Sequence, residues 1–515
     1  MTGALARLPD LLASHVLLSA AALLLGLAIS LPLAVAASRR PALARAALGA
    51  ASLIQTIPAL ALLALFYPML LALSALVGGG IPALGFLPSL LALTLYAILP
   101  ILRNAVTGLT GLDPALIEAA DGVGMTAGQK LRLVEAPLAA PVMMAGIRTA
   151  AVWTIGAATL ATTVGQPSLG DLIFAGLQTQ DWTLVLTGCI ASAALALAVD
   201  ALLGLVAFGI ARRHKILVWI GLASIAIGIL AAALPSLAVN PASQKTVVIG
   251  AKNFSEQYIL ARLIGQRLER AGYAVQYREG LGSAVIFRAL AAGDIHVYVD
   301  YSGTLWANEM KRSDTPSRAA MLAALKNWAA GAHRVTMMGP LGFENAYAIA
   351  VRGDDAARLK LETLDDLGRA APGMTLGSDL EFLERPEWAA LKSAYGLRFA
   401  ASRAYSPTFM YRALESRQAD AISAFSSDGR IAAMNLKVLA DPRGALPGYD
   451  AVLLVSPHVS RDSTLLDALW PLIDAIPVEA MREANYQVDR DADKQSPESA
   501  ARWLDGRIER AKPNR

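Results

Sequence analysis

The segment of the first 240 residues that carries the most chemistry is 118–137, EAADGVGMTAGQKLRLVEAP, a long polar stretch between hydrophobic runs. It combines carboxylates with a lysine, an arginine and three glycines. Just before it, Asp113 can cap a helix whose first residue is Pro114, a position where the missing N–H costs nothing. Two adjacent alanines give one face of this helix small side chains, so another protein can approach it closely. Gly122 and Gly124 then allow a sharp turn. The pattern predicts a short helix and turn that protrude from a hydrophobic bundle and contact another protein; a merely solvated loop is the alternative.

Other residue patterns exclude several classes of function. The five histidines show no metal-ligand spacing, and the single cysteine, Cys189, lies in an apolar run, so neither a metal site nor a disulfide is expected. The sequence shows no Ser/His/Asp cluster, no pair of catalytic carboxylates and no G-x-x-x-x-G-K-[ST] motif for nucleotide phosphates. A net charge of +4 without a basic, aromatic-rich patch gives no indication of nucleic-acid binding. We therefore expect a protein that is not an enzyme and holds no cofactor.

Charged residues divide the chain into two unlike halves. Residues 1–240 hold 8 of the 41 acidic and 11 of the 45 basic residues, which is typical of a membrane domain in contact with lipid. Since about 20 apolar residues cross a bilayer as a helix, we predict an all-α domain of about six transmembrane helices. The second apolar run is over-long and contains Pro58 and Pro68, so it should be kinked or re-entrant. The runs are Leu11–Ala37, Ala46–Val77, Leu84–Leu102, Ala139–Thr163, Leu184–Ile210 and Ile216–Leu234.

Basic residues predict the orientation of these helices. They gather after the first run at Arg39, Arg40 and Arg45, again within 130–132, and again within 212–215. Six alternating spans place all three clusters on one side, which the positive-inside rule makes cytoplasmic. Residues 113–137 then form a cytoplasmic loop, and the second half of the chain lies outside the cytoplasm.

The second half alternates strands and helices. TVVIGA is expected to form a strand, SEQYILARLIGQRLERAG a helix and AVQYREG a second strand, which predicts an α/β domain with a largely parallel sheet. A second α/β block follows, and AVLLVSPHVS then returns to the first, so we predict a two-lobed clamp that holds a ligand at the carboxyl ends of strands. The expected boundaries are 1–235 for the transmembrane domain, 236–245 for a linker, and 246–512 for the clamp, with lobe I at about 246–342 and 451–512 and lobe II at about 343–450.

The polar loop resembles the coupling loop of ABC importer permeases. The match continues through PLAAPVMMAGIRTA and VGQPSLGDLIFAGLQTQDW, covers most of residues 45–210, and is similar to the permeases of the osmoprotectant, or quaternary-amine, importers. The resemblance implies that the loop enters a cleft of a separate ATPase subunit, and that two copies of this chain form a homodimer. The residues that carry the coupling pattern are Glu118, Ala119, Ala120, Gly124, Val134 and Pro137.

Residues 245–510 resemble the binding proteins of the same importer family. The matching segments include GAKNFSEQYIL, VDYSGT, LGFENAYAIAV, EFLERPE, ADAISAFSSDGRI and LPGYDAVLLV. The resemblance implies a type II periplasmic-binding-protein fold, fused to its permease in one chain of the bacterial inner membrane, with the binding domain outside. A ligand-sensing membrane receptor is a competing hypothesis, although a receptor would not need the coupling loop.

The resemblance also implies a ligand site. A quaternary ammonium has no N–H to donate, so a protein holds it by the faces of aromatic rings, each worth about 0.5–2 kcal/mol when desolvated. The family's cage positions fall on four tyrosines and one phenylalanine, while Arg385 could grip a ligand carboxylate with two parallel N–H bonds. Loop-end polar groups would bind the rest of the ligand, and Asp428 would serve a cationic or hydroxyl-bearing group or cap its turn. The implied ligand-binding residues are Tyr301, Tyr347, Tyr405, Phe425, Tyr449, Arg385, Asn253, Ser283, Thr304 and Asp428.

Two departures from the family pattern leave the ligand open. Ala284 stands where an acidic or amide residue is frequent, and Phe425 stands where a tyrosine is frequent. Both changes make the expected cleft less polar. Glycine betaine, choline and carnitine are compatible with it, and so are a betaine-type thiol-histidine such as ergothioneine and other amino-acid-like solutes.

Overall fold

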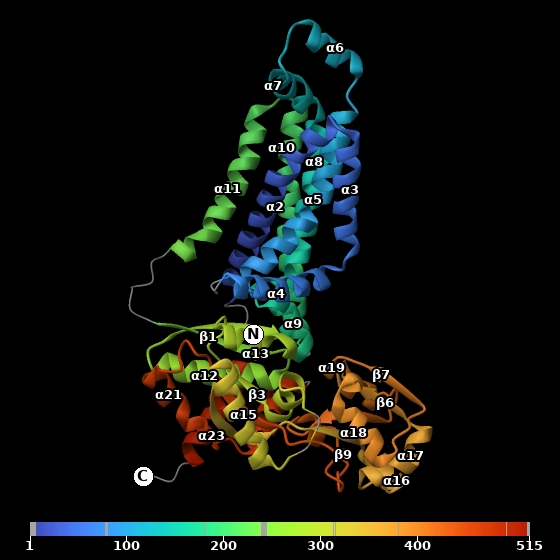
Figure 1. The fold of residues 1–515 in the computed structure, drawn as a ribbon, viewed down its shortest axis with the longest axis vertical. Coiled ribbons are helices and arrows are strands. Elements are labelled where there is room, and N and C mark those ends of the chain that lie inside the picture. Colours follow the sequence, from blue (N-terminus) through green and yellow to red (C-terminus); the bar gives the residue numbers. More distant parts are fainter. Residues whose placement is uncertain are drawn as a thin grey trace. The chain divides into compact units, whose positions relative to one another are not determined.

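The computed structural model describes residues 7–77, 81–179, 181–237, 245–312, 314, 316–379, 381–490 and 492–511 (Figure 1). Most of the expected linker, residues 238–244, lies outside these ranges. Contacts divide the chain into two compact units, residues 1–173 with 183–242 and residues 174–182 with 243–515. The described part of the first unit is helical and the second unit is α/β, so the predicted fold class is confirmed.

Long apolar helices build the first unit. Five described helices are long and apolar enough to cross a membrane, and a sixth span results if the bent pair α3 and α4 counts as one. This pair bends by 99° beside Ile57, whose extended backbone is the conformation that a following proline favours. The expected kink is thus observed before Pro58, whereas Pro68 lies inside α4. The helices within residues 7–237 are α2 (Leu8–Ser38), α3 (Pro41–Thr56), α4 (Ala59–Leu76), α5 (Phe86–Thr110), α6 (Pro114–Gly122), α7 (Ala127–Lys130), α8 (Ala136–Ala158), α9 (Gly170–Thr179), α10 (Trp182–Ala211) and α11 (Lys215–Leu237), with the π-helical turn η1 (Leu131–Glu135) before α8 and the 3-10 turn η2 (Thr159–Val164) after it. Most of α9 is grouped with the second unit.

Small residues bring the central helices close together. Helices α2, α5 and α8 lie side by side (Figure 1). A Cβ atom on Gly146 of α8 would lie 2.5 Å from the carbonyl oxygen of Pro100, and one on Gly108 of α5 would lie 3.1 Å from that of Ala139. Close backbone approach through small residues is the usual basis of helix association in membranes, because lipid supplies no hydrophobic driving force between helices.

One ion pair lies within the apolar helices. The guanidinium of Arg148 on α8 donates two hydrogen bonds to the carboxylate of Asp200 on α10, at 2.8 and 2.6 Å. Gly204, one turn further along α10, lies next to this guanidinium: a Cβ there would lie 3.4 Å from the guanidinium carbon, an ordinary contact distance. A charge in a spanning helix is costly unless an opposite charge and hydrogen bonds compensate it. The pair therefore ties α8 to α10.

Breaking this ion pair should destabilise the first unit. We expect Asp200→Ala to lower its stability by about 2 kcal/mol, because Arg148 loses its partner in apolar surroundings. The double variant Arg148→Leu with Asp200→Leu should recover most of the loss, since two apolar side chains leave no uncompensated charge. Thermal unfolding of the full chain in detergent measures both. Equal melting temperatures for the wild type and Asp200→Ala would contradict the expectation.

Two mixed sheets form the second unit, each defining one lobe. Lobe I holds the sheet β2-β1-β3-β10-β4 and lobe II the sheet β7-β6-β8-β5-β9. In each sheet parallel pairs sit beside antiparallel ones: β10 runs antiparallel to β3 and β4, and β5 runs antiparallel to β8 and β9. The sheets are therefore less parallel than expected. The strands are β1 (Thr246–Lys252), β2 (Ala274–Leu281), β3 (Val297–Tyr301), β4 (Thr336–Glu344), β5 (Tyr347–Arg352), β6 (Thr375–Ser378), β7 (Ala401–Ala404), β8 (Ala421–Phe425), β9 (Leu436–Val438) and β10 (Asp450–Val455).

The chain crosses between the lobes twice. It passes from β4 to β5 through Asn345 and Ala346, and from β9 to β10 through residues 439–449. Helix α12 packs almost entirely buried on lobe I, against β1, β2, α22 and α23. The helices of lobe I are α12 (Ser255–Arg270), α13 (Ser283–Ala292), α14 (Ser302–Thr304), α15 (Arg318–His333), α21 (Ser463–Leu469), α22 (Val478–Asp489) and α23 (Pro497–Ala511); those of lobe II are α16 (Gly353–Leu359), α17 (Leu364–Ala370), α18 (Pro386–Tyr395), α19 (Pro407–Glu415) and α20 (Arg430–Ala433).

Candidate functional site

A cavity of about 150 Å³ lies where side chains of the two lobes meet. Lobe I contributes residues at and just after the end of β1 and at the end of β3, together with the start of α13, the last residue of α14 and the segment before β10. Lobe II contributes the start of β5, the end of β8 and the residues after β6. Such ends of strands and starts of helices are where α/β folds bind ligands. The lining residues are Lys252, Asn253, Phe254, Ser283, Tyr301, Thr304, Asn345, Tyr347, Asp379, Glu381, Arg385, Phe425 and Tyr449.

Five aromatic rings line this cavity and follow one another in space. The ring of Phe254 lies 6.1 Å from that of Tyr301 and 6.5 Å from that of Phe425, measured between centroids. Tyr347 lies 5.0 Å from Phe425 and 5.9 Å from Tyr449. The pairing of β5 with β8 explains the contact between Tyr347 and Phe425, which are directly opposite each other in the ladder. The aromatic walls thus come from both lobes.

Acidic groups complete the lobe II side of the cavity. Asp379 is buried and accepts hydrogen bonds from the N–H groups of Glu381 and Phe382, at 2.8 and 3.0 Å. Burial raises the pKa of Asp379, and these hydrogen bonds offset part of the rise. Aromatic faces together with nearby carboxylates favour a cationic ligand, particularly one without N–H groups.

Arg385 is held mainly by a neighbouring glutamate. Its guanidinium donates two hydrogen bonds to the buried carboxylate of Glu387, at 3.2 and 3.1 Å, and one to the hydroxyl of Tyr449, at 3.3 Å. It also lies 5.3 Å from the ring centroid of Tyr347. Burial raises the pKa of Tyr347 and of Tyr449, so both tyrosines keep their hydroxyl protons. Arg385 therefore supports two aromatic walls, and its Nη1 donates a hydrogen bond to the carboxylate of Glu381 at 3.4 Å.

Most residues that the sequence marked for the ligand meet in this cavity. It is lined by Asn253, Ser283, Tyr301, Thr304, Tyr347, Arg385, Phe425 and Tyr449.

Two of the marked residues lie elsewhere. Tyr405 follows β7, donates its N–H to the carbonyl of Ser378 at 2.8 Å, and packs beside the lobe II core around Ile422. Asp428 instead forms an ion pair with Arg430 in a neighbouring pocket. The side chain of Ala284 lies outside the described residues.

The cavity also contains residues that the sequence argument missed. Phe254 lies between β1 and α12, two residues after the end of β1, and contacts two cage aromatics; its place near the end of a strand was the available signal. Lys252 is buried, forms an ion pair with Asp300, and lies 5.4 Å from the ring centroid of Tyr301. No pattern in the sequence pointed to Asn345, Asp379 or Glu381.

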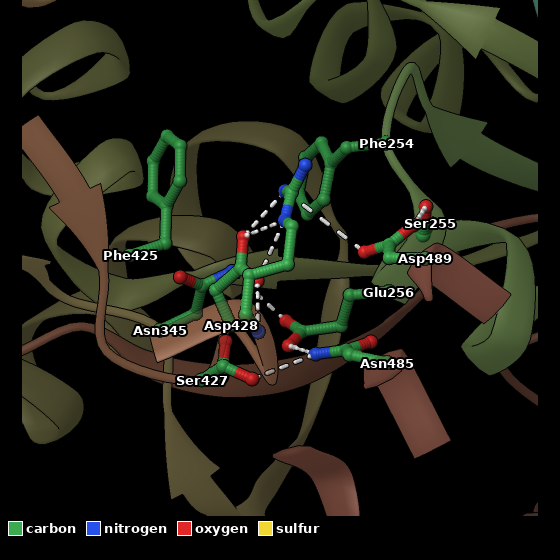
Figure 2. A pocket seen from close by; sticks show the side chains of 10 residues that line it. Phe254, Ser255, Glu256, Asn345, Phe425, Ser427, Asp428, Asn485 and Asp489 are labelled. Atoms are coloured by element: carbon green, nitrogen blue, oxygen red, sulfur yellow. Dashed lines mark hydrogen bonds and ion pairs between the residues drawn. The ribbon is translucent and has the colours of Figure 1, made fainter. Parts of the chain in front are cut away.

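A second, polar pocket of about 60 Å³ adjoins the first (Figure 2). Phe254, Asn345 and Phe425 line both pockets. In Figure 2 Asp428, which pairs with Arg430, lies on one side of the pocket, and the buried Glu256 lies on the other. Its lining also includes Ser255, Ser427, Asn485 and Asp489; burial raises the pKa of Asp489 to about 6.

The polar segment 118–137 forms the helix and turn that its sequence predicts. Asp113 caps α6 by accepting the N–H of Ala115 at 2.9 Å. Gly124 follows α6 with φ +77°, a left-handed conformation that glycine adopts without strain. A capping box between Thr126 and Gln129 then starts α7.

Several residues of this segment are free to contact another protein. Glu118, Ala119, Gly124 and Pro137 are exposed, whereas Ala120 is buried. Three apolar side chains beside them are also exposed, by 46% at Leu116, 73% at Val123 and 62% at Leu133. Exposed apolar side chains on such a segment indicate a binding surface. Behind it, an ion pair joins Glu135 at the end of η1 to Arg39 at the end of α2.

Comparisons with known proteins match both halves of the chain. Residues 245–506 match the substrate binding domain of the ABC-type glycine betaine transport system, and residues 26–212 match the inner membrane component of binding-protein-dependent transport systems. The chain is 30% identical, over 87% of its length and 80% of the relative's, to the ergothioneine transport permease/ergothioneine binding protein of Helicobacter pylori.

Two further comparisons each concern one half. The choline transport system permease protein of Bacillus subtilis is 41% identical over 36% of this chain and 80% of its own. The crystal structure of a glycine betaine/carnitine/choline ABC transporter protein aligns with 51% of this chain and 97% of its own, at 26% identity and a TM-score of 0.45. The chain has a multi-pass inner-membrane domain and a binding domain of the extracytoplasmic type, and it belongs to the glycine betaine, choline and carnitine type of ABC importers as a fusion of permease and substrate-binding protein.

Proposed function

We propose that the chain captures a methylated ammonium solute in the cavity between the lobes and imports it. The observation that carries the proposal is the set of five aromatic rings from both lobes around one cavity that also holds Asp379 and Glu381. Each ring can contribute about 0.5–2 kcal/mol to a desolvated quaternary ammonium. Because the rings come from both lobes, a bound ligand that contacts them all stabilises the closed clamp, and closure of the clamp in turn strengthens ligand binding.

The polar end of the ligand would meet the rim of the cavity. Asn253, Ser283 and Thr304 offer an amide and two hydroxyls on lobe I. Glu387 accepts from two donors of Arg385. We propose that Arg385 reaches a ligand carboxylate through Nη1, which in this structure donates to the exposed carboxylate of Glu381, while it holds Tyr449 in place.

Two ligand classes are supported by different observations. Matches to the glycine betaine family and to the choline permease favour a simple quaternary amine such as glycine betaine, choline or carnitine. A relative that shares both halves of this chain is named for ergothioneine, which is itself a trimethylated amine, and this favours ergothioneine as the second candidate.

Titration of the full chain separates these classes. Calorimetry in detergent with glycine betaine, choline, carnitine and ergothioneine should show saturable binding of at least one of them, with unmethylated histidine and glycine as matched controls that do not bind. Equal binding of a methylated amine and its unmethylated control would refute recognition by an aromatic cage, since only the methylated cation lacks N–H groups to be satisfied.

The first unit would act as the pore half of this importer. We propose that residues 1–235 form the permease domain, 236–245 the linker and 246–512 the binding domain. We further propose that two copies of the chain assemble and that Glu118, Ala119, Ala120, Gly124 and Pro137 belong to the surface that docks a separate ATPase subunit. The exposed apolar side chains of Leu116, Val123 and Leu133 support this docking role.

A further inference from the structure

Glu256, the second residue of α12, is a buried carboxylate outside the aromatic cavity. It accepts hydrogen bonds from the hydroxyl of Tyr301 at 2.6 Å and from the amide of Asn345 at 3.0 Å, both on Oε1. Its other oxygen accepts the amide of Asn485 at 2.9 Å. Figure 2 shows Glu256 beside the polar pocket with Asn485 below it. Burial raises the pKa of Glu256, and hydrogen bonds to its carboxylate, from Ser427 as well as from these three donors, offset part of the rise.

The three donors connect a ring of the aromatic cavity with the segments that join the two lobes. Tyr301 ends β3 and is a wall of the aromatic cavity, and its hydroxyl also accepts a hydrogen bond from Gln257 at 3.0 Å. Asn345 lies in the crossing from lobe I to lobe II and lines the same cavity. The ring of Tyr301 and the first crossing are thus held by one oxygen atom.

Asn485 extends this connection to lobe II. Its amide nitrogen donates one hydrogen bond to Glu256 and another, at 2.9 Å, to the backbone carbonyl of Ser427, in the loop after β8. The neighbouring Ser426 is paired with Ala346 of the first crossing, because each accepts the N–H of the other residue at 2.9 Å. Hinge motions of two-lobed proteins are absorbed by a few residues at such crossings.

We propose that Glu256 is a positioning residue for ligand capture, because its carboxylate fixes the cage ring of Tyr301 to the crossing and to the lobe II loop that close the clamp. This inference rests on the proposed function, since it concerns the same cavity. Glu256 does not line that cavity and acts through Tyr301 and Asn345, which do. A glutamine at this position would present an NH₂ group to at least one of the three donors, so one hydrogen bond would be lost while the side chain keeps its size.

A double-mutant cycle on the full chain tests this role. Glycine betaine, choline and ergothioneine are titrated into the wild type, and the one that binds most tightly is used for the variants. We expect Glu256→Gln to weaken its binding about tenfold and Tyr301→Phe to weaken it less. The double variant should bind no more weakly than Glu256→Gln alone, because both changes disturb the same hydrogen-bonded cluster that holds the ring of Tyr301.

Two further measurements separate positioning from a general loss of stability. The ligand-free melting temperature of Glu256→Gln should stay close to that of the wild type, since the change removes a buried charge without creating a cavity. Glu279→Gln is the matched control, because Glu279 is half-buried in lobe I, where it pairs with Arg262, and does not line the cavity. It should bind the ligand as the wild type does.

Each contrary outcome has its own meaning. Binding by Glu256→Gln within twofold of the wild type would overturn the inference, as would effects of Glu256→Gln and Tyr301→Phe that simply add. If Glu256→Gln binds more weakly and its ligand-free melting temperature is lowered enough to explain the loss, Glu256 has a structural role and the inference is overturned. If the wild type binds none of the three compounds, the proposed function itself fails, and the inference with it.

Discussion

Gly124→Val should reduce uptake at least tenfold while ligand binding stays unchanged. Gly124 has φ +77°, and no other atom lies within 4 Å of the place where a Cβ would stand. The substitution therefore acts through the backbone alone: a β-branched residue disfavours the left-handed conformation and redirects the chain between α6 and α7. The exposed groups of the two helices would then no longer form one surface for the ATPase.

Gly122→Ala is the matched control for this change. Gly122 ends α6 and has as much free space around its Cα, but its φ is not in the left-handed region. Alanine is also the better helix former, so we expect near-normal uptake. The assay is solute uptake into proteoliposomes that contain the chain and its ATPase, with ligand titration and ATP hydrolysis measured in parallel. Normal uptake by Gly124→Val would refute the docking role, and lost ligand binding would indicate misfolding instead.

The membrane half was predictable to the level of individual spans because hydropathy and proline act locally. A run of apolar residues specifies a spanning helix wherever it lies, and Pro58 restricts Ile57 to the extended backbone that ends α3. Pro68 carries the same local signal but remains inside α4. Packing of the surrounding helix can retain a proline, so only the structure decides which proline breaks the run.

Within the binding half, motifs located residues near the ligand but did not determine where the side chains point. Tyr347 and Tyr405 both flank lobe II strands in recognisable segments. Tyr347 faces the cavity because β5 pairs with β8 and brings it opposite Phe425. Tyr405 follows the edge strand β7, and its ring packs beside Gly377 within lobe II. The order and register of the strands determine which of the two tyrosines faces the cavity. A local sequence motif encodes neither strand order nor register.

The hydrogen-bond partners of buried charged groups were the other feature that the sequence did not show. Arg385 could be predicted as a carboxylate binder because of its guanidinium, yet two of its hydrogen bonds go to Glu387, two residues away. The hydroxyl of Tyr449, which is distant in sequence, takes another. Glu256 likewise collects donors from three separated segments. Such networks depend on tertiary contacts and become visible only in the folded chain.

Tyr347→Ala should have the largest effect on ligand affinity, weakening binding of the most tightly bound methylated amine about 30-fold or more. The ring is one wall of the cavity and also supports two others, Phe425 at 5.0 Å and Tyr449 at 5.9 Å. Loss of about 2 kcal/mol from one cation–π contact corresponds to roughly 30-fold at 1.4 kcal/mol per decade, and loosening of the neighbouring rings adds to it. Tyr347→Phe keeps the ring and should bind within about threefold of the wild type.

Tyr405→Ala provides the matched comparison, because it removes the same side chain from the same lobe outside the cavity. We expect its affinity to stay close to that of the wild type. Calorimetric titration of the full chain measures all three variants, and their ligand-free melting curves report whether each remains folded. An effect of Tyr405→Ala as large as that of Tyr347→Ala, with both proteins folded, would mean that the ligand lies deeper in lobe II than this cavity. Equal affinity of Tyr347→Ala and the wild type would remove the aromatic cage, and with it the physical reason for selecting a cation that has no hydrogen to donate.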